Sequence, residues 1–237
     1  MSSAIIPGLF TVGNLFCGFL AIHYIVQGNF TPAAWLIVLG AALDNMDGKI
    51  ARYIGGDTNF GIELDSLVDI CTFGMAPALM IYYSHLNQTG WGAVIAFAFL
   101  LCGALRLARF NVLSLNEEKG DYYMGLPIPV AAVILTQYVV FTERSWQTNH
   151  GAPFAILLVL LLAALMVSRL EYDSMPNFRS GAVWDRLKQL YLGVSLILII
   201  HPTTSKHFFF PITMLYIVSG LYRWVSNIVS NQATQHA

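Results

Sequence analysis

The sequence predicts an all-α, polytopic transmembrane bundle of about eight spans. Of its 237 residues, 57% are hydrophobic and 11% are charged, whereas a soluble domain has roughly 25% charged residues. Several runs of about 20 residues carry no charge, which is the length that a helix needs to cross ~30 Å of hydrocarbon. The formal net charge of −1 offers no basic surface for nucleic acid, so we expect none as a partner.

Eight segments have the composition of membrane spans. They are residues 9–27, 32–53, 60–84, 91–113, 125–142, 153–169, 187–201 and 208–226. We expect six of these helices to form the core of one domain over residues 1–237, with two helices added to it. The seventh segment is short, and a six-span arrangement remains open if the last two segments are misassigned together.

The distribution of Lys and Arg predicts the orientation in the membrane. In the eight-span arrangement, ten of the twelve basic residues fall on one side, and Arg144 and Lys206 fall on the other. Loops rich in Lys and Arg stay in the cytoplasm. Both chain termini are therefore expected to be cytoplasmic, in a bacterial or archaeal cell membrane.

Acidic residues gather in the stretch "LDNMDGKIARYIGGDTNFGIELDSLVD", residues 43–69. Asp44 and Asp47 are three residues apart and Asp65 and Asp69 are four apart, so each pair shares one helix face. Gly55-Gly56 between the pairs favours a break. The stretch is therefore predicted to be a helical hairpin that brings four carboxylates together at the cytoplasmic edge of the membrane.

Four neighbouring carboxylates repel one another and are costly to remove from water. They are stable together if some are protonated or if cations lie among them. Lys49 and Arg52 cannot balance the six acidic residues of this stretch, which favours metal. Oxygen ligands suit hard divalent cations, and two metals about 4 Å apart are typical of displacement at phosphorus. We therefore expect two divalent cations, Mg²⁺ or Mn²⁺.

Small residues accompany the acids. Gly48 and Ala51 follow Asp47, and Gly61 precedes Asp65 by four positions. At helical spacing they would leave a shallow floor for a flat or bulky ligand, although close helix packing is the alternative. Arg52 lies on the same face as Gly48 and is suited either to holding a phosphate or to anchoring the helix at the headgroups.

These residues form the pattern D-x2-D-G-x2-A-R-x8-G-x3-D-x3-D without a gap. The pattern resembles the signature of the CDP-alcohol phosphotransferases. The resemblance implies that a hydroxyl attacks the lipid-bearing phosphorus of a CDP-linked donor and that CMP leaves. It implies that Asp44, Asp47, Asp65 and Asp69 hold two divalent cations and that Asp69 is also the general base. It further implies that four residues line the CDP site: Gly48, Ala51, Arg52 and Gly61.

Four further segments narrow the resemblance. They are "IPGLFTVGNLFCGFLAIHY", "FGMAPALM", "GALRLARFNV" and "GLPIPVAA". Over about residues 1–135 they resemble the phosphatidylserine synthases of bacteria and archaea, which implies CDP-diacylglycerol as donor, L-serine as acceptor and a homodimer. Gly8 departs from the family's "IPN" start, where an Asn is expected. The helices within residues 150–227 carry no motif and are assigned to scaffold or dimer interface.

Five polar residues outside the signature are candidates for the site. Thr11 and Asn14 are suited either to cytidine contact or to helix–helix hydrogen bonding. Arg106 and Arg109 are suited either to holding the serine carboxylate or donor phosphate, or to anchoring at the cytoplasmic face. Asn111 could assist the arginines.

Other functions remain open at this stage. The same chemistry could use inositol phosphate, glycerol phosphate or choline as acceptor, or an archaeal ether lipid as donor. A membrane prenyltransferase also uses Mg²⁺ and Asp-rich helices, but its second Asp motif has no counterpart here. A cation transporter would hold its carboxylates near the bilayer midplane on broken helices, rather than at the cytoplasmic edge.

Overall fold

The computed structural model describes residues 5–54, 59–115, 122–145, 151–168 and 170–173. Their elements are α1 (Ile5–Val26), α2 (Phe30–Ile54), α3 (Asn59–Asp69), η1 (Ile70–Met75), α4 (Ala76–Ile81), η2 (Tyr82–Leu86), α5 (Gly92–Leu115), β1 (Tyr122–Met124), α6 (Ile128–Ser145), α7 (Gly151–Val167) and β2 (Glu171–Asp173). The helical fold class is thus confirmed for the described part of the chain. The last two predicted spans, 187–201 and 208–226, lie outside it.

The chain divides into two compact units. The first comprises residues 1–119 and 127–167 and contains all the helices named above. The second comprises residues 120–126 and 168–237, and its described part is an antiparallel pairing of β1 with β2. The register pairs Tyr122 with Asp173 and Met124 with Glu171. The sequence pattern did not predict these two short strands.

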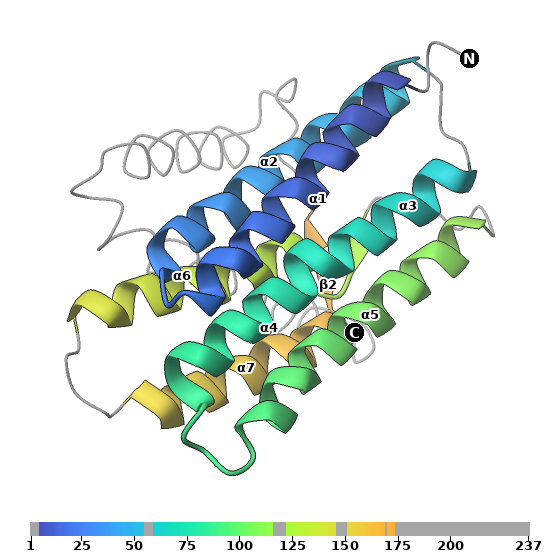
Figure 1. Cartoon of the computed structure of the whole chain (residues 1–237). Helices are drawn as coiled ribbons and strands as arrows, with labels where there is room; N and C mark the ends of the chain where they lie inside the picture. Colours follow the sequence, from blue (N-terminus) through green and yellow to red (C-terminus); the bar gives the residue numbers. More distant parts are fainter. Residues whose placement is uncertain (1–4, 55–58, 116–121, 146–150, 169, 174–237) are drawn as a thin grey trace, which may run out of the picture. The chain divides into compact units, whose positions relative to one another are not determined.

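Helices α1 and α2 form an antiparallel hairpin (Figure 1). Gly28 follows the end of α1 with a φ of +76°, a conformation that favours glycine. The Gly28 and Asn29 amides donate to the carbonyls of Ile25 and Tyr24, each at 2.9 Å, so they satisfy carbonyls that the helix end leaves open. This tight turn reverses the chain, so α2 runs antiparallel to α1.

The third span is one long helix made of α3, η1, α4 and η2, and it contains two wide π-helical segments. The Ala76 amide donates to the Cys71 carbonyl, five residues back, at the end of η1. Pro77 follows in the first turn of α4. A proline has no amide to donate and its ring clashes with the carbonyl four residues back, so the wide turn before it relieves both conflicts.

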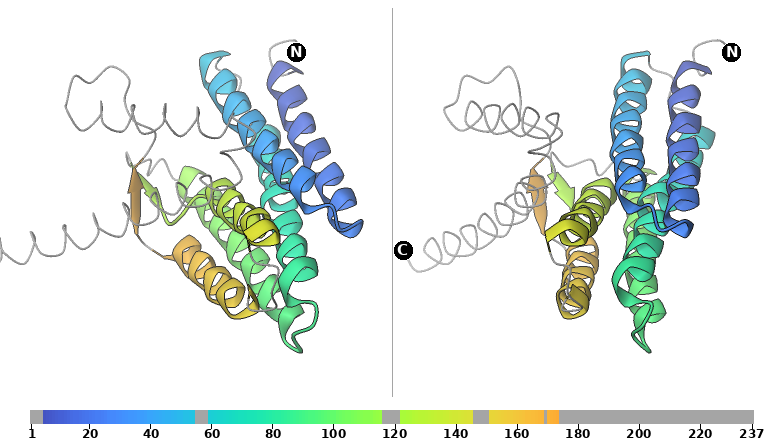
Figure 2. Two further views of the ribbon diagram at one scale, coloured as in Figure 1. Left: turned by 90° about the vertical axis from the view of Figure 1, so that its left-hand side faces the viewer. Right: turned by 60° about the vertical axis from the view of Figure 1, so that its left-hand side comes forward.

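Helices α5, α6 and α7 complete the first unit (Figure 2). α5 packs against α7 and against η1, whereas α6 packs against α2 and α4. The Ala131 amide donates to the Pro127 carbonyl at 3.0 Å, so α6 begins directly after Pro127. Pro127 and Pro129 therefore shape the entry to this helix, as their positions in the sequence indicate.

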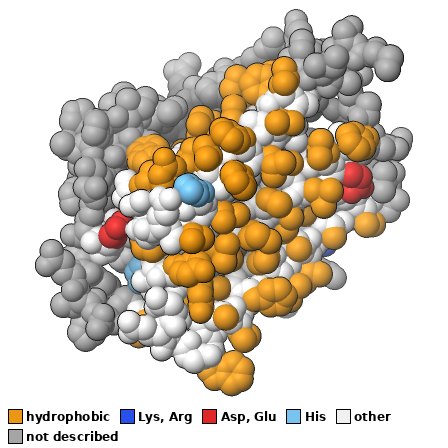
Figure 3. All heavy atoms as spheres, in the orientation of Figure 1, with side chains coloured by type: hydrophobic (Ala, Val, Ile, Leu, Met, Phe, Trp, Pro, Cys, Tyr) orange, Lys and Arg blue, Asp and Glu red, His pale blue; other side chains and the backbone are white. Residues whose placement is uncertain are grey.

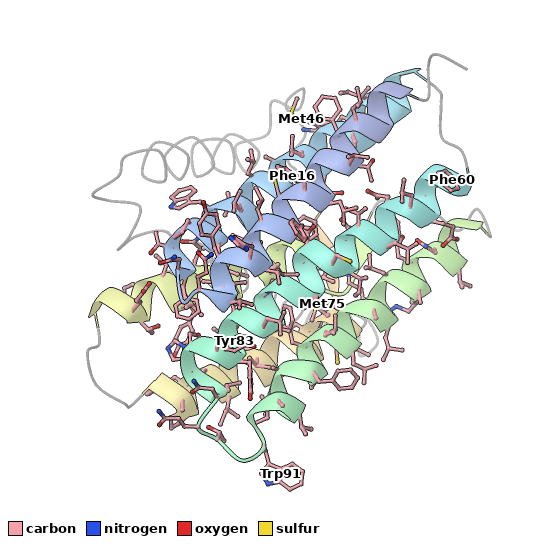
Figure 4. All side chains as sticks on the ribbon, viewed as in Figure 1. Phe16, Met46, Phe60, Met75, Tyr83 and Trp91 are labelled. Carbon is pink, nitrogen blue, oxygen red and sulfur yellow. The ribbon has the colours of Figure 1, made fainter. Side chains whose placement is uncertain are left out.

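Three described helices are long and apolar enough to cross a membrane: Gly8–Val26, Phe60–Leu86 and Gly92–Val112. Ile128–Glu143 and Ala152–Val167 are shorter apolar helices. Hydrophobic side chains dominate the described part of the face in Figure 3, and acidic side chains lie toward its left and right edges. The exposed aromatic rings of Phe60 and Trp91 lie at opposite ends of the bundle (Figure 4), and tryptophan is enriched at the membrane–water interface. These features are those of an integral membrane protein.

Candidate active site

Three of the four signature aspartates form a compact group. One carboxylate oxygen from each of Asp44, Asp47 and Asp65 lies within 4.8 Å of the others. Asp69 stands outside this group, yet it is close enough to repel all three electrostatically. The structure therefore brings the four acids of the predicted hairpin together, with Asp69 set apart from the other three.

Helical spacing on two chain segments produces this arrangement. α2 carries Asp44 and Asp47 one turn apart, and α3 carries Asp65 and Asp69 one turn apart. α1 packs along α2 and also against α3 and η1. Asp47 and Asp69 are only 5% and 6% exposed, so these two charges are largely removed from water and need partners close by.

Two side chains of α1 supply such partners. The Thr11 hydroxyl donates a 3.0 Å hydrogen bond to Asp47 Oδ2. The Asn14 amide donates a 3.3 Å hydrogen bond to Asp69 Oδ1. Both residues are buried. Of the two alternatives that the sequence left open for Thr11 and Asn14, hydrogen bonding between helices is thus present in the structure.

Among the described residues, Arg106 on α5 is the basic residue that reaches the acids. It is 7% exposed, and its charge attracts the carboxylates of Asp44 and Asp69. One arginine cannot balance four carboxylates. The described side chains thus leave a net negative charge at the site, which protons or cations would compensate.

The donor set of this site fits a hard divalent cation. Carboxylate oxygens are the ligands that Mg²⁺ and Mn²⁺ prefer. Asp65 Oδ1 is buried without a hydrogen-bond partner among the described residues, which is the state of an oxygen left open for a ligand. Asp44, Asp47 and Asp65 are thus the residues best placed to hold metal, and Asp69 lies beside them.

The other two candidates on α5 are engaged in contacts between helices. Arg109 Nη1 donates a 3.2 Å hydrogen bond to the carbonyl of Val167, the last residue of α7. Asn111 Nδ2 donates a 3.0 Å hydrogen bond to Ser66 Oγ on α3. Ser66 lies between Asp65 and Asp69 in the chain. Its hydrogen bond to Asn111 was not predicted, although a polar residue on an otherwise apolar helix often has a partner on another helix.

The structure describes the surroundings of two of the small residues of the signature, Gly48 and Gly61. Gly48 is exposed, and a Cβ added to it would meet nothing within 4 Å. Gly61 is also exposed. The side chains of Ala51 and Arg52 lie outside the described part, as does Asp57. Glu63 is exposed, in agreement with its position out of phase with the aspartate pairs.

An acid cluster on apolar helices has the donor set that a membrane-embedded, metal-using enzyme requires. A model of the CDP-alcohol phosphatidyltransferase family matches residues 4–230. The chain therefore belongs to the CDP-alcohol phosphatidyltransferase family. Membership confirms the resemblance carried by the signature and argues against the prenyltransferase and transporter alternatives.

Three relatives illustrate the similarity. A protein of Helicobacter pylori (strain ATCC 700392 / 26695) named CDP-diacylglycerol–serine O-phosphatidyltransferase is 34% identical over 222 residues, covering 92% of this chain and 90% of the relative. A protein of the same name from Bacillus subtilis (strain 168) is 35% identical, covering 75% and 93%. An archaetidylserine synthase of Methanothermobacter thermautotrophicus is 34% identical, covering 70% and 69%.

Proposed function

We propose that this protein transfers the phosphatidyl group of CDP-diacylglycerol to the hydroxyl of L-serine, giving phosphatidylserine and CMP. The observation that carries the proposal is the aspartate cluster, which stands at the spacing of the family signature on α2 and α3. The names and the coverage of the relatives support serine as the acceptor. The apolar helices keep the acyl chains of the donor in the bilayer beside the site.

The chemistry requires charge compensation and a base. Asp44, Asp47 and Asp65 would hold two divalent cations together with Asp69, and such cations stabilise negative charge on a diphosphate when bound. The serine hydroxyl is a weak nucleophile until a carboxylate accepts its proton. Asp69 would accept that proton as the serine oxygen bonds to the lipid-bearing phosphorus and the bond from that phosphorus to the CMP oxygen breaks.

The hydrogen bonding of Asp69 supports its role as the base. The Asn14 amide binds Asp69 Oδ1, which leaves the second oxygen of that carboxylate to receive a proton. The Thr11 hydroxyl orients Asp47 in a similar way. Asn14 and Thr11 would thus act through the acids, and any contact of theirs with cytidine is an addition to this role.

The nucleotide would lie over the small residues of the signature. Gly48 is open toward its surroundings, with nothing within 4 Å of the Cβ position. Gly61 is exposed. A flat cytidine ring or a diphosphate can approach the backbone most closely where no side chain intervenes. Ala51 and Arg52 would complete this surface.

Arg106 is the best supported contact for the serine carboxylate or the donor phosphate. It is buried beside Asp44 and Asp69, and a guanidinium can bind a carboxylate or phosphate through two parallel hydrogen bonds. Arg109 and Asn111 remain secondary candidates, because each already binds another helix.

The assay should also include an ether-linked donor, because one relative is named an archaetidylserine synthase. The chemistry at phosphorus is the same for an ester-linked and an ether-linked donor, since the acyl or alkyl chains lie away from the reacting atoms.

We further propose that the site and both chain termini face the cytoplasm, as the distribution of Lys and Arg indicates. We also propose that residues 1–237 act as one domain and that the protein is a homodimer.

CMP release by the purified full-length protein tests the function. The assay supplies CDP-diacylglycerol or its ether analogue with each candidate alcohol, with and without Mg²⁺ or Mn²⁺. Release that requires both L-serine and metal is expected. Release with inositol phosphate, glycerol phosphate or choline instead would replace the acceptor. Absence of release with every alcohol, from folded protein that binds metal, would contradict the transferase assignment.

A further inference from the structure

Thr72 lies on η1, three residues after Asp69, and is fully buried. Its hydroxyl donates a 3.1 Å hydrogen bond to the backbone carbonyl of Asn14 on α1. The side-chain amide of the same Asn14 donates to Asp69 Oδ1 at 3.3 Å. Asp69 and Thr72 therefore hold Asn14 from two sides, one through its amide and one through its backbone.

Two glycines make room for this arrangement. A Cβ at Gly18 on α1 would clash with Thr72 Oγ1 and would lie 3.0 Å from Thr72 Cα. A Cβ at Gly40 on α2 would lie 2.9 Å from Thr72 Cγ2 and 2.8 Å from Asn14 Oδ1. Thr72 and Asn14 are thus enclosed where α1, α2 and η1 approach most closely, and they have little freedom to move.

The π-helical geometry sets the spacing between Asp69 and Thr72. The wide turn of η1 begins directly after Asp69 and contains Thr72. Short π-helical segments inside a longer helix often occur at functional sites. Here the segment presents the Thr72 hydroxyl to Asn14 while leaving Asp69 at the end of α3, within reach of the other acids.

We propose that Thr72 is a positioning residue that fixes Asn14, and through Asn14 the carboxylate of Asp69, for proton transfer from the acceptor. This inference rests on the proposed function of Asp69. Thr72 itself has no part in binding donor or acceptor. Loss of its hydroxyl removes the bond that ties η1 to α1 at Asn14, so η1 and with it the carboxylate of Asp69 can shift away from the position that accepts the proton.

The expected effect falls on the rate of the chemical step. Misplacement of a catalytic group by about 1 Å can cost on the order of 100-fold in rate. Thr72→Val keeps the shape of the side chain and removes its hydroxyl, so kcat should fall roughly 10- to 100-fold. KM for serine and for the donor should stay within about twofold, because substrate contacts persist. Thr72→Ser retains the hydroxyl and should keep most of the activity.

Thr136 provides a matched control. It is buried on α6, and among the described residues its hydroxyl donates within its own helix, to the carbonyls of Ala132 and Val133. Thr136→Val therefore removes a buried threonine hydroxyl without releasing Asn14. The experiment measures CMP release, thermal unfolding and Mn²⁺ affinity for the wild type and the Thr72→Val, Thr72→Ser and Thr136→Val variants, all as full-length protein in nanodiscs.

The inference is supported if only Thr72→Val loses kcat at unchanged KM, while Thr72→Ser and Thr136→Val keep the wild-type kcat. It is overturned if Thr72→Val retains the wild-type kcat, or if Thr72→Ser or Thr136→Val loses as much. If Thr72→Val does not fold, Thr72→Ala removes the same hydroxyl and should lower kcat as well; an unchanged kcat in that variant overturns the inference. Failure of the proposed function is distinguishable, because the wild type itself would then release no CMP with any acceptor.

Discussion

Arg109 on α5 donates a 3.2 Å hydrogen bond to the backbone carbonyl of Val167, the last residue of α7. A cation at a helix C-terminus satisfies an open carbonyl and interacts favourably with the helix dipole. Arg106, one turn earlier on α5, instead faces the carboxylates of Asp44 and Asp69. Two arginines that look equivalent in the sequence thus have different neighbours.

Substitution of each arginine by glutamine should separate these roles. Arg109→Gln is expected to lower the free energy of unfolding by about 1 kcal/mol, through loss of a charged hydrogen bond at a helix end. Arg106→Gln should lower kcat/KM for serine or for the donor at least 10-fold, as expected for a lost charge-assisted contact of roughly 1.5–3 kcal/mol. Thermal unfolding and steady-state kinetics of both variants make the comparison. A larger rise of the serine KM in Arg109→Gln would move the acceptor contact to Arg109.

Asp69→Asn should abolish most of the activity while preserving the fold. The amide has nearly the shape of the carboxylate but accepts no proton, and general base catalysis contributes roughly 10²- to 10⁴-fold to rate. The rate of CMP release at saturating serine measures this loss. Glu63→Gln is the matched control, because Glu63 is an exposed acid on the same helix and its charge has no role in the proposed reaction. Similar losses in both variants would contradict the assignment of the base.

Asp65→Asn should weaken metal binding. Asp65 contributes to the group of three carboxylates, and one of its oxygens is buried without a partner among the described residues. Removal of one carboxylate ligand lowers both the charge and the donor strength of the site. Mn²⁺ titration followed by electron paramagnetic resonance should show a reduced affinity or fewer bound ions than in the wild type. An unchanged titration would mean that the metal, if any, is held elsewhere.

The effect of Gly48→Ala should be confined to function. The added Cβ meets nothing within 4 Å, and alanine favours a helix by about 1 kcal/mol over glycine, so the protein should be as stable as the wild type or more so. If the nucleotide lies against this position, the methyl group raises KM for CDP-diacylglycerol. Kinetics at varied donor concentration would reveal the rise. A stable variant with wild-type KM would place the nucleotide away from Gly48.

The helices and the acid cluster could be predicted because their causes are local. Apolar runs of span length with few charges identify α1, the third span and α5, and spacings of three and four put the aspartates on common faces. Such patterns could not predict which residues of other helices the acids bind. Thr11 binds Asp47 across 36 positions of the chain and Asn14 binds Asp69 across 55. Periodicity specifies which face a residue occupies and says nothing about which other helix meets that face.

The strands and the π-helical turns escaped prediction for related reasons. β1 and β2 are three residues each and lie 47 positions or more apart in the chain, so neither has a recognisable pattern of its own. The wide turn of η1 results from a local conflict at Pro77 inside an apolar run that otherwise reads as a regular helix. The motif "FGMAPALM" carried the proline, and with it the one sequence signal of this turn.

The wide turns also change how the third span must be numbered on a helical wheel. A π-helical turn takes up about one residue more than an α-helical turn, which corresponds to about 100° of rotation. A wheel drawn from Asp65 and Asp69 therefore loses phase after Met75, and again within η2. Cross-linking pairs and spin-label sites between residues 76 and 86 should be chosen from the structure. Ideal helical periodicity would place them on the wrong side of the helix.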